Sequence, residues 1–188
     1  MSSEPRIPKT EVNGIYGGLV KTMSRRQLGL VPDSLGVMWH NRDVLNATYA
    51  LGRKTKKWDE CDEQLKSLAH MAVSAYVGCS FCMDFGYYAA HSQGLDTSKL
   101  GDIPFWREST AFTPQERRVL EYAEAMTVTP PEVTDEMAEA LRRDLGNEAF
   151  IELTMMVAVE NERSRLNSAL GLTSQGFKDH CELRPAGA

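Results

Sequence analysis

The sequence predicts an all-α fold in a single domain. The chain has 188 residues, 42% of them hydrophobic, which is enough for one compact core. Its apolar residues recur at the i, i+3, i+4, i+7 spacing of amphipathic helices, whereas no run alternates apolar and polar residues with period two. We expect one helical domain over residues 14–172, with a flexible N-terminal arm over 1–13 and a C-terminal tail over 173–188.

The first elements of this domain are two longer helices with a short one between them. An apolar pattern begins at Ile15 and stops at Gly29, where a glycine can end a helix. Residues 32–39 follow as a short segment that Pro32 opens. Asn41 then resets the chain for a helix whose apolar positions fall on one face.

Two consecutive helices form the centre of the chain. The first is expected to have Asp59 as its cap and runs to Gly78; its apolar positions are Leu65, Leu68, Ala69, Ala72, Val73 and Tyr76. The second begins at Cys79 and stops at Gly94. A brief helical turn over 96–98 and an irregular connection over 101–112 should follow.

The last three helices have clear start and stop signals. Thr113-Pro114-Gln115-Glu116 is a capping box with proline at the first helical position, and that helix ends before Pro130. Thr134 opens the next helix, which Gly146 closes. The longest helix covers 147–170 and ends at Gly171.

Charge and hydropathy exclude several classes of partner. The net charge is −5, and no basic stripe runs along an expected helix, so we expect no nucleic-acid surface. No apolar run is long enough to cross a membrane, and the polar first residues do not resemble a signal peptide. We expect a soluble cytoplasmic protein with no membrane partner.

The segment with the clearest chemistry is Gly78-Cys79-Ser80-Phe81-Cys82, which contains two of the four cysteines. The C-x-x-C spacing brings two sulfurs within disulfide reach at the start of a helix, where the helix dipole stabilises a thiolate. Two other interpretations stay open. The cysteines could be small buried hydrophobes, or they could be half of a zinc site that takes further ligands from His70, His91, Asp84, Cys61 or Cys181.

In the order of its segments, the chain resembles the carboxymuconolactone decarboxylase/alkylhydroperoxidase-D family over residues 33–172. The resemblance rests on the helix that Gly-Cys-x-x-Cys opens, the helix that begins Pro-Gln-Glu-Arg, and the final run from Arg163 through Asn167 to Gly171. It implies an all-helical core that assembles into dimers, trimers or hexamers. Members that decarboxylate muconolactones lack the cysteine pair, so Cys79 and Cys82 favour the branch that reduces peroxides.

For that branch the resemblance implies a thiol peroxidase cycle. The Cys82 thiolate reacts with a hydroperoxide to give a sulfenic acid, and Cys79 condenses with it to form a disulfide. A separate protein with a dithiol then reduces the pair. No metal and no organic cofactor is implied.

The sequence departs from the family pattern where protons are moved. The peroxidase pattern has a glutamate twelve residues before the first cysteine and a histidine four residues after the second. Here those positions are Ser67 and Gly86, and Phe81 stands where some members have a histidine between the cysteines. Neither serine nor glycine can act as a base at neutral pH.

His70 and Asp84 are the candidates to replace this relay. His70 precedes the cysteines by two to three helical turns, and its imidazole suits proton transfer, although a core histidine is the plain alternative. Asp84 could hold such a histidine or act as a weak base, or simply favour the helix dipole. Other acids that could supply a carboxylate are Asp59, Glu60, Glu63, Glu160 and Glu162. Glu160, Arg163 and Asn167 also fit an internal or subunit-facing polar network.

Two other function classes stay open from the sequence. The chain could be a redox-responsive or ligand-binding oligomer that kept the fold without the peroxidase reaction. It could also be a lyase or isomerase that uses a pocket between helices, with His70 or a glutamate as base. Cys61 lies among acids that disfavour its thiolate, and Cys181 lies in the tail.

Overall fold

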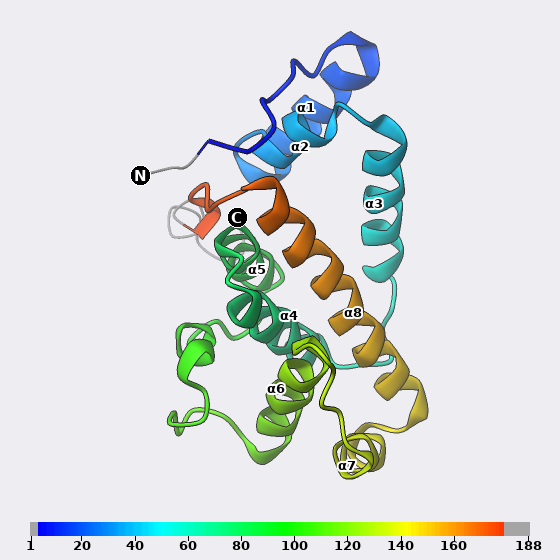
Figure 1. The fold of residues 1–188 in the computed structure, drawn as a ribbon, viewed down its shortest axis with the longest axis vertical. Coiled ribbons are helices and arrows are strands. Elements are labelled where there is room, and N and C mark those ends of the chain that lie inside the picture. Colours follow the sequence, from blue (N-terminus) through cyan, green and yellow to red (C-terminus); the bar gives the residue numbers. More distant parts are fainter. Residues whose placement is uncertain (1–3, 179–188) are drawn as a thin grey trace.

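The structure is a computed structural model that describes residues 4–178, and within that range it contains helices and no strand. This confirms the all-α prediction. Figure 1 shows the arrangement, and the elements in chain order are α1 Gly14–Leu28, α2 Asp33–Met38, α3 Arg42–Thr55, α4 Glu63–Val77, α5 Ser80–Ser92, the 3-10 helix η1 Leu100–Phe105, α6 Pro114–Thr127, α7 Asp135–Leu145 and α8 Asn147–Leu170. No helix in the described part of the chain is both long and apolar enough to cross a membrane.

Helix α4 is the centre of the fold, because α5, α6, α8 and η1 all pack against it. Leu68, Ala69 and Val73 on its buried face have no exposed surface. The helix begins after Asp62, whose carboxylate accepts a hydrogen bond from the Leu65 N–H at 3.1 Å. The expected cap, Asp59, is therefore wrong by three residues, since the chain turns once more before it becomes helical.

Most of the other predicted boundaries agree with the structure. Both halves of the capping box are present at Thr113 and Glu116, and Gly171 ends α8 in the left-handed conformation. The connection expected to be irregular over 101–112 begins instead with η1, which has Pro104 in its interior. A 3-10 helix tolerates this proline because the helix is only six residues long.

The N-terminal segment is docked on the helices rather than extended from them, which corrects the expectation of a flexible arm. The Arg6 N–H donates to the Leu170 carbonyl at 2.9 Å, and the Arg6 guanidinium reaches the carbonyls of Ser168 and Ala169 at 2.6 Å. Val12 is buried against the α1–α3 region. These contacts cover the C-terminal end of α8, where carbonyl groups lack helical partners.

The described residues after α8, 171–178, also belong to the folded body, so the expected domain boundary at 172 falls too early. Phe177 has no exposed surface and packs in one cluster with Cys79, Cys82 and Leu172. Cys181 lies outside the described residues. The C-terminal segment therefore returns to the helix that the cysteines open.

Candidate functional site: a buried disulfide beside an acid–histidine pair

A disulfide links Cys79 and Cys82 at the start of α5, with the two Cα atoms 5.3 Å apart. Cys79 is the N-cap residue of the helix, and its sulfur accepts a hydrogen bond from the Cys82 N–H at 3.2 Å. This geometry arises because Gly78 ends α4 with a φ of +74° and turns the chain directly into α5. The cysteines are 1% and 3% exposed, so the disulfide is sealed from solvent.

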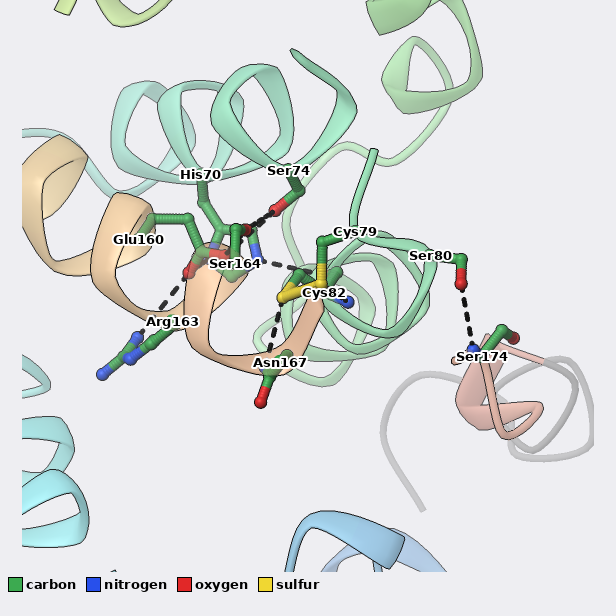
Figure 2. Close-up of a disulfide and its surroundings, with 10 residues drawn as sticks. All are labelled: His70, Ser74, Cys79, Ser80, Cys82, Glu160, Arg163, Ser164, Asn167 and Ser174. Carbon is green, nitrogen blue, oxygen red and sulfur yellow. Dashed lines mark hydrogen bonds and ion pairs between the residues drawn. A yellow bond between two sulfur atoms is a disulfide. The ribbon is translucent and has the colours of Figure 1, made fainter. Parts of the chain in front are cut away.

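Asn167 on α8 contacts the second sulfur. Its Nδ2 donates to the Cys82 Sγ at 3.3 Å, as Figure 2 shows. A donor at this distance would stabilise a Cys82 thiolate once the disulfide is reduced. The sequence predicts a polar network around Asn167 but not this contact, because 85 residues separate Asn167 from Cys82.

His70 on α4 lies between the disulfide and a buried acid. Its Nδ1 is 3.1 Å from Oε2 of Glu160, and its Nε2 is 3.2 Å from the Cys82 carbonyl oxygen. A carbonyl can only accept a hydrogen bond, so Nε2 carries a proton in this geometry. The ring therefore connects the Cys82 backbone to the Glu160 carboxylate.

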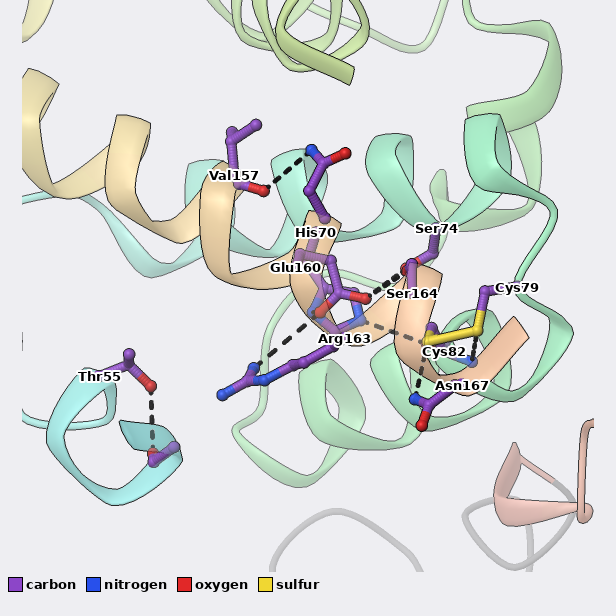
Figure 3. A network of polar contacts seen from close by, with 12 residues as sticks. Thr55, His70, Ser74, Cys79, Cys82, Val157, Glu160, Arg163, Ser164 and Asn167 are labelled. Carbon is purple, nitrogen blue, oxygen red and sulfur yellow. Dashed lines mark hydrogen bonds and ion pairs between the residues drawn. A yellow bond between two sulfur atoms is a disulfide. The ribbon is translucent and has the colours of Figure 1, made fainter. Parts of the chain in front are cut away.

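Glu160 on α8 is the acid of this pair, and only 1% of it is exposed. Figure 3 shows the network around it. Its Oε1 accepts hydrogen bonds from the hydroxyls of Ser74 at 3.0 Å and Ser164 at 2.8 Å. Its Oε2 has no hydrogen bond among the described residues. The imidazole of His70, at 3.1 Å, and the guanidinium of Arg163, at 4.0 Å, lie near it. One oxygen is therefore held by neutral hydroxyls, and the other faces the imidazole.

At position 86, where the peroxidase pattern has a histidine, the structure leaves no room for a side chain. A Cβ atom built on Gly86 would lie 2.6 Å from His70 Nε2 and 2.7 Å from the Met71 sulfur. Contacts under 3.0 Å require something to shift. The imidazole from α4 therefore fills the space that a side chain from α5 would need.

The remaining acidic candidates lie apart from this pair. Glu63 contacts Lys66 at 2.7 Å, the Glu60 N–H donates to Glu152, and Asp59 and Glu162 are exposed. None of these acids has a contact with His70, Cys79 or Cys82 among the described residues. Ser67 is half-buried, and Phe81 packs in the apolar cluster beside the disulfide.

Asp84 is bound to the C-terminal segment and not to His70. Its carboxylate accepts hydrogen bonds from the Ser174 hydroxyl and from the backbone N–H groups of Gln175, Phe177 and Lys178, at 2.8 to 3.1 Å. Burial acts to raise the pKa of Asp84, but these four hydrogen bonds outweigh it and hold the pKa below its ordinary value. The expected role as a weak base or as the partner of His70 is therefore not supported.

Apolar side chains surround the disulfide, and the third described cysteine belongs to another part of the core. Phe81, Phe85, Tyr88 and Phe177 form one aromatic cluster with centroids 5.6 to 6.4 Å apart. Burial raises the pKa of the Cys61 thiol to about 11, and the charge of Glu152 adds to this shift. Within residues 4–178, no three side chains of His, Cys, Asp or Glu gather as a metal site would require.

This fold and site define an all-helical protein in which a C-x-x-C pair opens a helix of the core. A model of the carboxymuconolactone decarboxylase family matches residues 42–125. The uncharacterized protein YnjA of Escherichia coli (strain K12) is 32% identical over 127 residues, which cover 68% of this chain and 70% of that protein. The chain belongs to the carboxymuconolactone decarboxylase family.

Solved structures share the fold over nearly the whole chain. The debrominase Bmp8, in a variant complexed with 2,3,4-tribromopyrrole, has a TM-score of 0.80 at 20% identity and covers 97% of this chain and 98% of its own. A peroxidase-related protein from Ralstonia eutropha JMP134, described as an alkylhydroperoxidase AhpD core, has a TM-score of 0.80 at 17% identity over 92% and 94%. At these identities the similarity extends to the fold alone.

Proposed function

We propose that the protein is a thiol-dependent oxidoreductase that reduces hydroperoxides through a dithiol–disulfide cycle of Cys79 and Cys82. The observation that carries this proposal is the disulfide at the N-terminus of α5, with an amide donor on one sulfur and an acid–histidine pair beside the same cysteine. Neither two inert buried cysteines nor a structural disulfide would need a buried carboxylate with one oxygen turned to an imidazole.

The first step is the attack on the peroxide. In the reduced protein His70 takes the other tautomer, in which Nδ1 donates its proton to Glu160 and Nε2 turns from the Cys82 carbonyl to the Cys82 thiol. Nε2 accepts the thiol proton, Glu160 balances the resulting imidazolium, and Asn167 donates to the thiolate. The thiolate attacks the terminal oxygen of the hydroperoxide; a sulfur–oxygen bond forms as the oxygen–oxygen bond breaks. The imidazolium returns its proton to the departing alkoxide, so the products are an alcohol and a Cys82 sulfenic acid.

The second step closes the disulfide. The Cys79 sulfur, already within hydrogen-bond distance of the Cys82 N–H, attacks the sulfenic sulfur and displaces hydroxide, which leaves as water with the Cys79 proton. An external protein dithiol then supplies two electrons and two protons to reopen the bond. Such a cycle needs a reducing compartment, so the proposal includes a cytoplasmic location.

The test is a stoichiometric reaction of the reduced protein with cumene hydroperoxide. We expect one alcohol formed for each pair of thiols lost, with Cys82→Ser abolishing the reaction. Cys61→Ala is the matched control, because it removes a buried thiol outside the site and should leave the stoichiometry unchanged. Alcohol formation that persists in Cys82→Ser would contradict the proposal.

A second candidate for the same dithiol is reductive removal of halogen from a small aromatic compound. The aromatic cluster beside the disulfide favours it, and the structurally similar Bmp8 is a debrominase. The balanced reaction converts an aryl bromide and two thiols into the arene, a disulfide and hydrogen bromide. Bromide release from 2,3,4-tribromopyrrole in single turnover, with no reaction with cumene hydroperoxide, would select this candidate instead.

We also propose that copies of the chain assemble through α1 and α3. These helices expose large apolar side chains, among them Ile15 at 97%, Leu19 at 58% and Val44 at 47% exposure. Large apolar side chains exposed on the surface are typical of a protein contact when they lie together. Light scattering of Leu19→Glu should give a smaller particle than the unmodified protein, whereas Ile151→Glu, an exposed apolar position on α8, should not.

A further inference from the structure

We propose that the C-terminal strap, defined as residues 173–178, determines which molecules reach the Cys79–Cys82 disulfide. In this proposal Phe177 is the plug over the disulfide and Asp84 is the latch that holds the strap. The proposal takes from the proposed function only that the disulfide is the reacting group. It adds a discrimination by size between small reagents and protein dithiols.

The latch is the Asp84 carboxylate, which accepts hydrogen bonds from four residues of the strap. Four hydrogen bonds to Asp84 come from Ser174, Gln175, Phe177 and Lys178, three of them from backbone N–H groups. Gly176, with a φ of +74°, turns the backbone so that the N–H groups on both sides point at the carboxylate. Asp84 comes two residues after Cys82 on α5, so the latch is built into the helix that bears the disulfide.

The plug is the Phe177 side chain. It has no exposed surface, and it stands edge-on to both Phe81 and Phe85 with ring centroids 5.6 Å apart. It packs in the same cluster as Cys79 and Cys82. Removing this ring would therefore open the apolar wall beside the sulfurs.

The strap is the part of this wall that can leave most readily. The other cover over the disulfide comes from residues in or next to helices α1, α2, α5 and α8. In the strap, in contrast, residues 173–175 lie outside any helix, and only Phe177 and Lys178 are in helical conformation. Besides the latch, the strap's hydrogen bonds to other described residues are one from the Ser174 N–H to the Ser80 hydroxyl at 3.2 Å and one from the Asp33 N–H to Gln175 at 2.8 Å.

The consequence follows from the geometry of disulfide exchange. The attacking thiolate must approach a sulfur along the sulfur–sulfur axis, and a protein dithiol brings a whole surface with it. A small phosphine or peroxide can enter through side-chain motion alone. The closed strap should therefore slow a protein dithiol far more than a small reductant.

The test compares two reductants on the oxidised protein: tris(2-carboxyethyl)phosphine and a reduced thioredoxin, with thiols counted by alkylation and intact mass. In Asp84→Asn and Phe177→Ala we expect the thioredoxin rate to rise at least tenfold, and the phosphine rate to rise much less. Asp96→Asn is the matched control, because Asp96 also accepts a backbone hydrogen bond but lies remote from the disulfide. Unchanged thioredoxin rates in both variants, at unchanged circular dichroism, would overturn the proposal.

A measurement on the unmodified protein covers the case in which a variant fails to fold. Amide hydrogen exchange at Gln175, Phe177 and Lys178 should be at least a hundredfold faster than in α4, because the strap opens without the core. Equal protection of strap and α4 would overturn the proposal. Neither measurement uses a peroxide. A failure of peroxide turnover would therefore not count against the strap proposal, and a rigid strap would not count against the proposed dithiol cycle.

Discussion

Two acid–base pairs join α4 to α8, and they differ in how completely their polar atoms are hydrogen-bonded. Lys66 Nζ lies 2.6 Å from Oε1 of Glu152, and His70 Nδ1 lies 3.1 Å from Oε2 of Glu160. Lys66 and His70 are four residues apart on α4, so both pairs lie on one stripe of that helix. The interface between α4 and α8 therefore buries two carboxylates, one beside an ammonium and one beside an imidazole.

The Lys66 pair is complete. Its ammonium has three donors, and it contacts the Trp58 carbonyl at 2.7 Å as well as Glu63 and Glu152. The second oxygen of Glu152 accepts the Glu60 N–H at 2.9 Å. Burial acts to lower the pKa of Lys66, but its hydrogen bonds to Glu152 and Glu63 raise it above the ordinary value. The ammonium stays charged, and the pair can only be structural.

The His70 pair is incomplete. Oε2 of Glu160 lacks a hydrogen bond among the described residues, and the partner is an imidazole, the side chain that ordinarily exchanges protons near neutral pH. The ring's other nitrogen contacts the backbone of Cys82. The comparison teaches two conditions under which a buried carboxylate is a candidate for proton transfer. Its partner can release a proton, and the pair lies next to a reactive residue.

The largest expected effect concerns the complete pair. Glu152→Ala leaves the Lys66 ammonium buried without its main partner, and it should lower the free energy of unfolding by about 3–5 kcal/mol. Urea denaturation of the oxidised protein measures this loss. Replacing both residues, as Lys66→Met with Glu152→Leu, should recover most of it, and a loss below about 1 kcal/mol in the single variant would argue against a structural pair.

Crowding at Gly86 should have a smaller effect. Gly86→Ala places a methyl group against His70 and Met71 and should cost about 1–3 kcal/mol of stability through overpacking. Gly18→Ala is the control, since its added methyl group meets open space in a helix and should be neutral or stabilising by up to about 1 kcal/mol. In a His70→Ala background the cost of Gly86→Ala should fall; an equal cost in both backgrounds would mean that His70 does not occupy this space.

The hydrogen bond from Asn167 should shift the titration of Cys82 by about one pKa unit. Asn167→Leu removes the donor to the thiolate, and a hydrogen bond to a charged group is worth about 1.5 kcal/mol, so the pKa should rise. Absorbance at 240 nm against pH, in a Cys79→Ser background, follows the thiolate. Asn161→Leu, one to two turns earlier on α8, should leave the titration unchanged.

The smallest expected effect is the pH dependence of disulfide reduction, and it concerns a third acid, Asp84. Unlike Glu152 and Glu160, Asp84 is held by a hydroxyl and backbone N–H groups and not by a basic side chain. Its folded pKa is depressed, so its stabilisation of the strap is present above the ordinary aspartate pKa of about 3.9 and is lost as pH falls through the folded pKa. Phosphine reduction of the disulfide should therefore accelerate below about pH 4, but by much less than the tenfold change expected for thioredoxin when Asp84 is replaced. The nearby charged groups are Lys178, whose ammonium lies over the Tyr87 ring, and Asp33, paired with Lys9 at 2.9 Å. An acceleration that persists in Asp84→Asn would assign the effect to another group.

The sequence predicted the helices well, because local signals determine where they begin and end. The capping box at Thr113 and the glycines after α4 and α8 stop or start a helix through interactions within a few residues. Asp59 failed as a cap because several acids precede α4 and the sequence does not rank them. The strap was missed because its contacts to Asp84 join residues about ninety positions apart.

The candidate site could be predicted only in part for the same reason. The C-x-x-C spacing identified Cys79 and Cys82, and the absence of a family base drew attention to His70. Neither the pairing of His70 with Glu160 nor the donor from Asn167 could be derived, since both depend on how α4, α5 and α8 pack. Gly86 carried the missing signal, because a glycine inside a helix often marks a close approach.

The most direct test of the proton role of His70 and Glu160 is the single-turnover rate of disulfide formation when the reduced protein meets cumene hydroperoxide at pH 7. We expect Glu160→Gln, which keeps the shape of the side chain, to lower this rate about a hundredfold or more. Glu152→Gln makes the same change in the complete pair and should leave the rate of the folded protein within about threefold. A rate in Glu160→Gln within threefold of the unmodified protein, or an equal loss in both variants, would contradict the assignment.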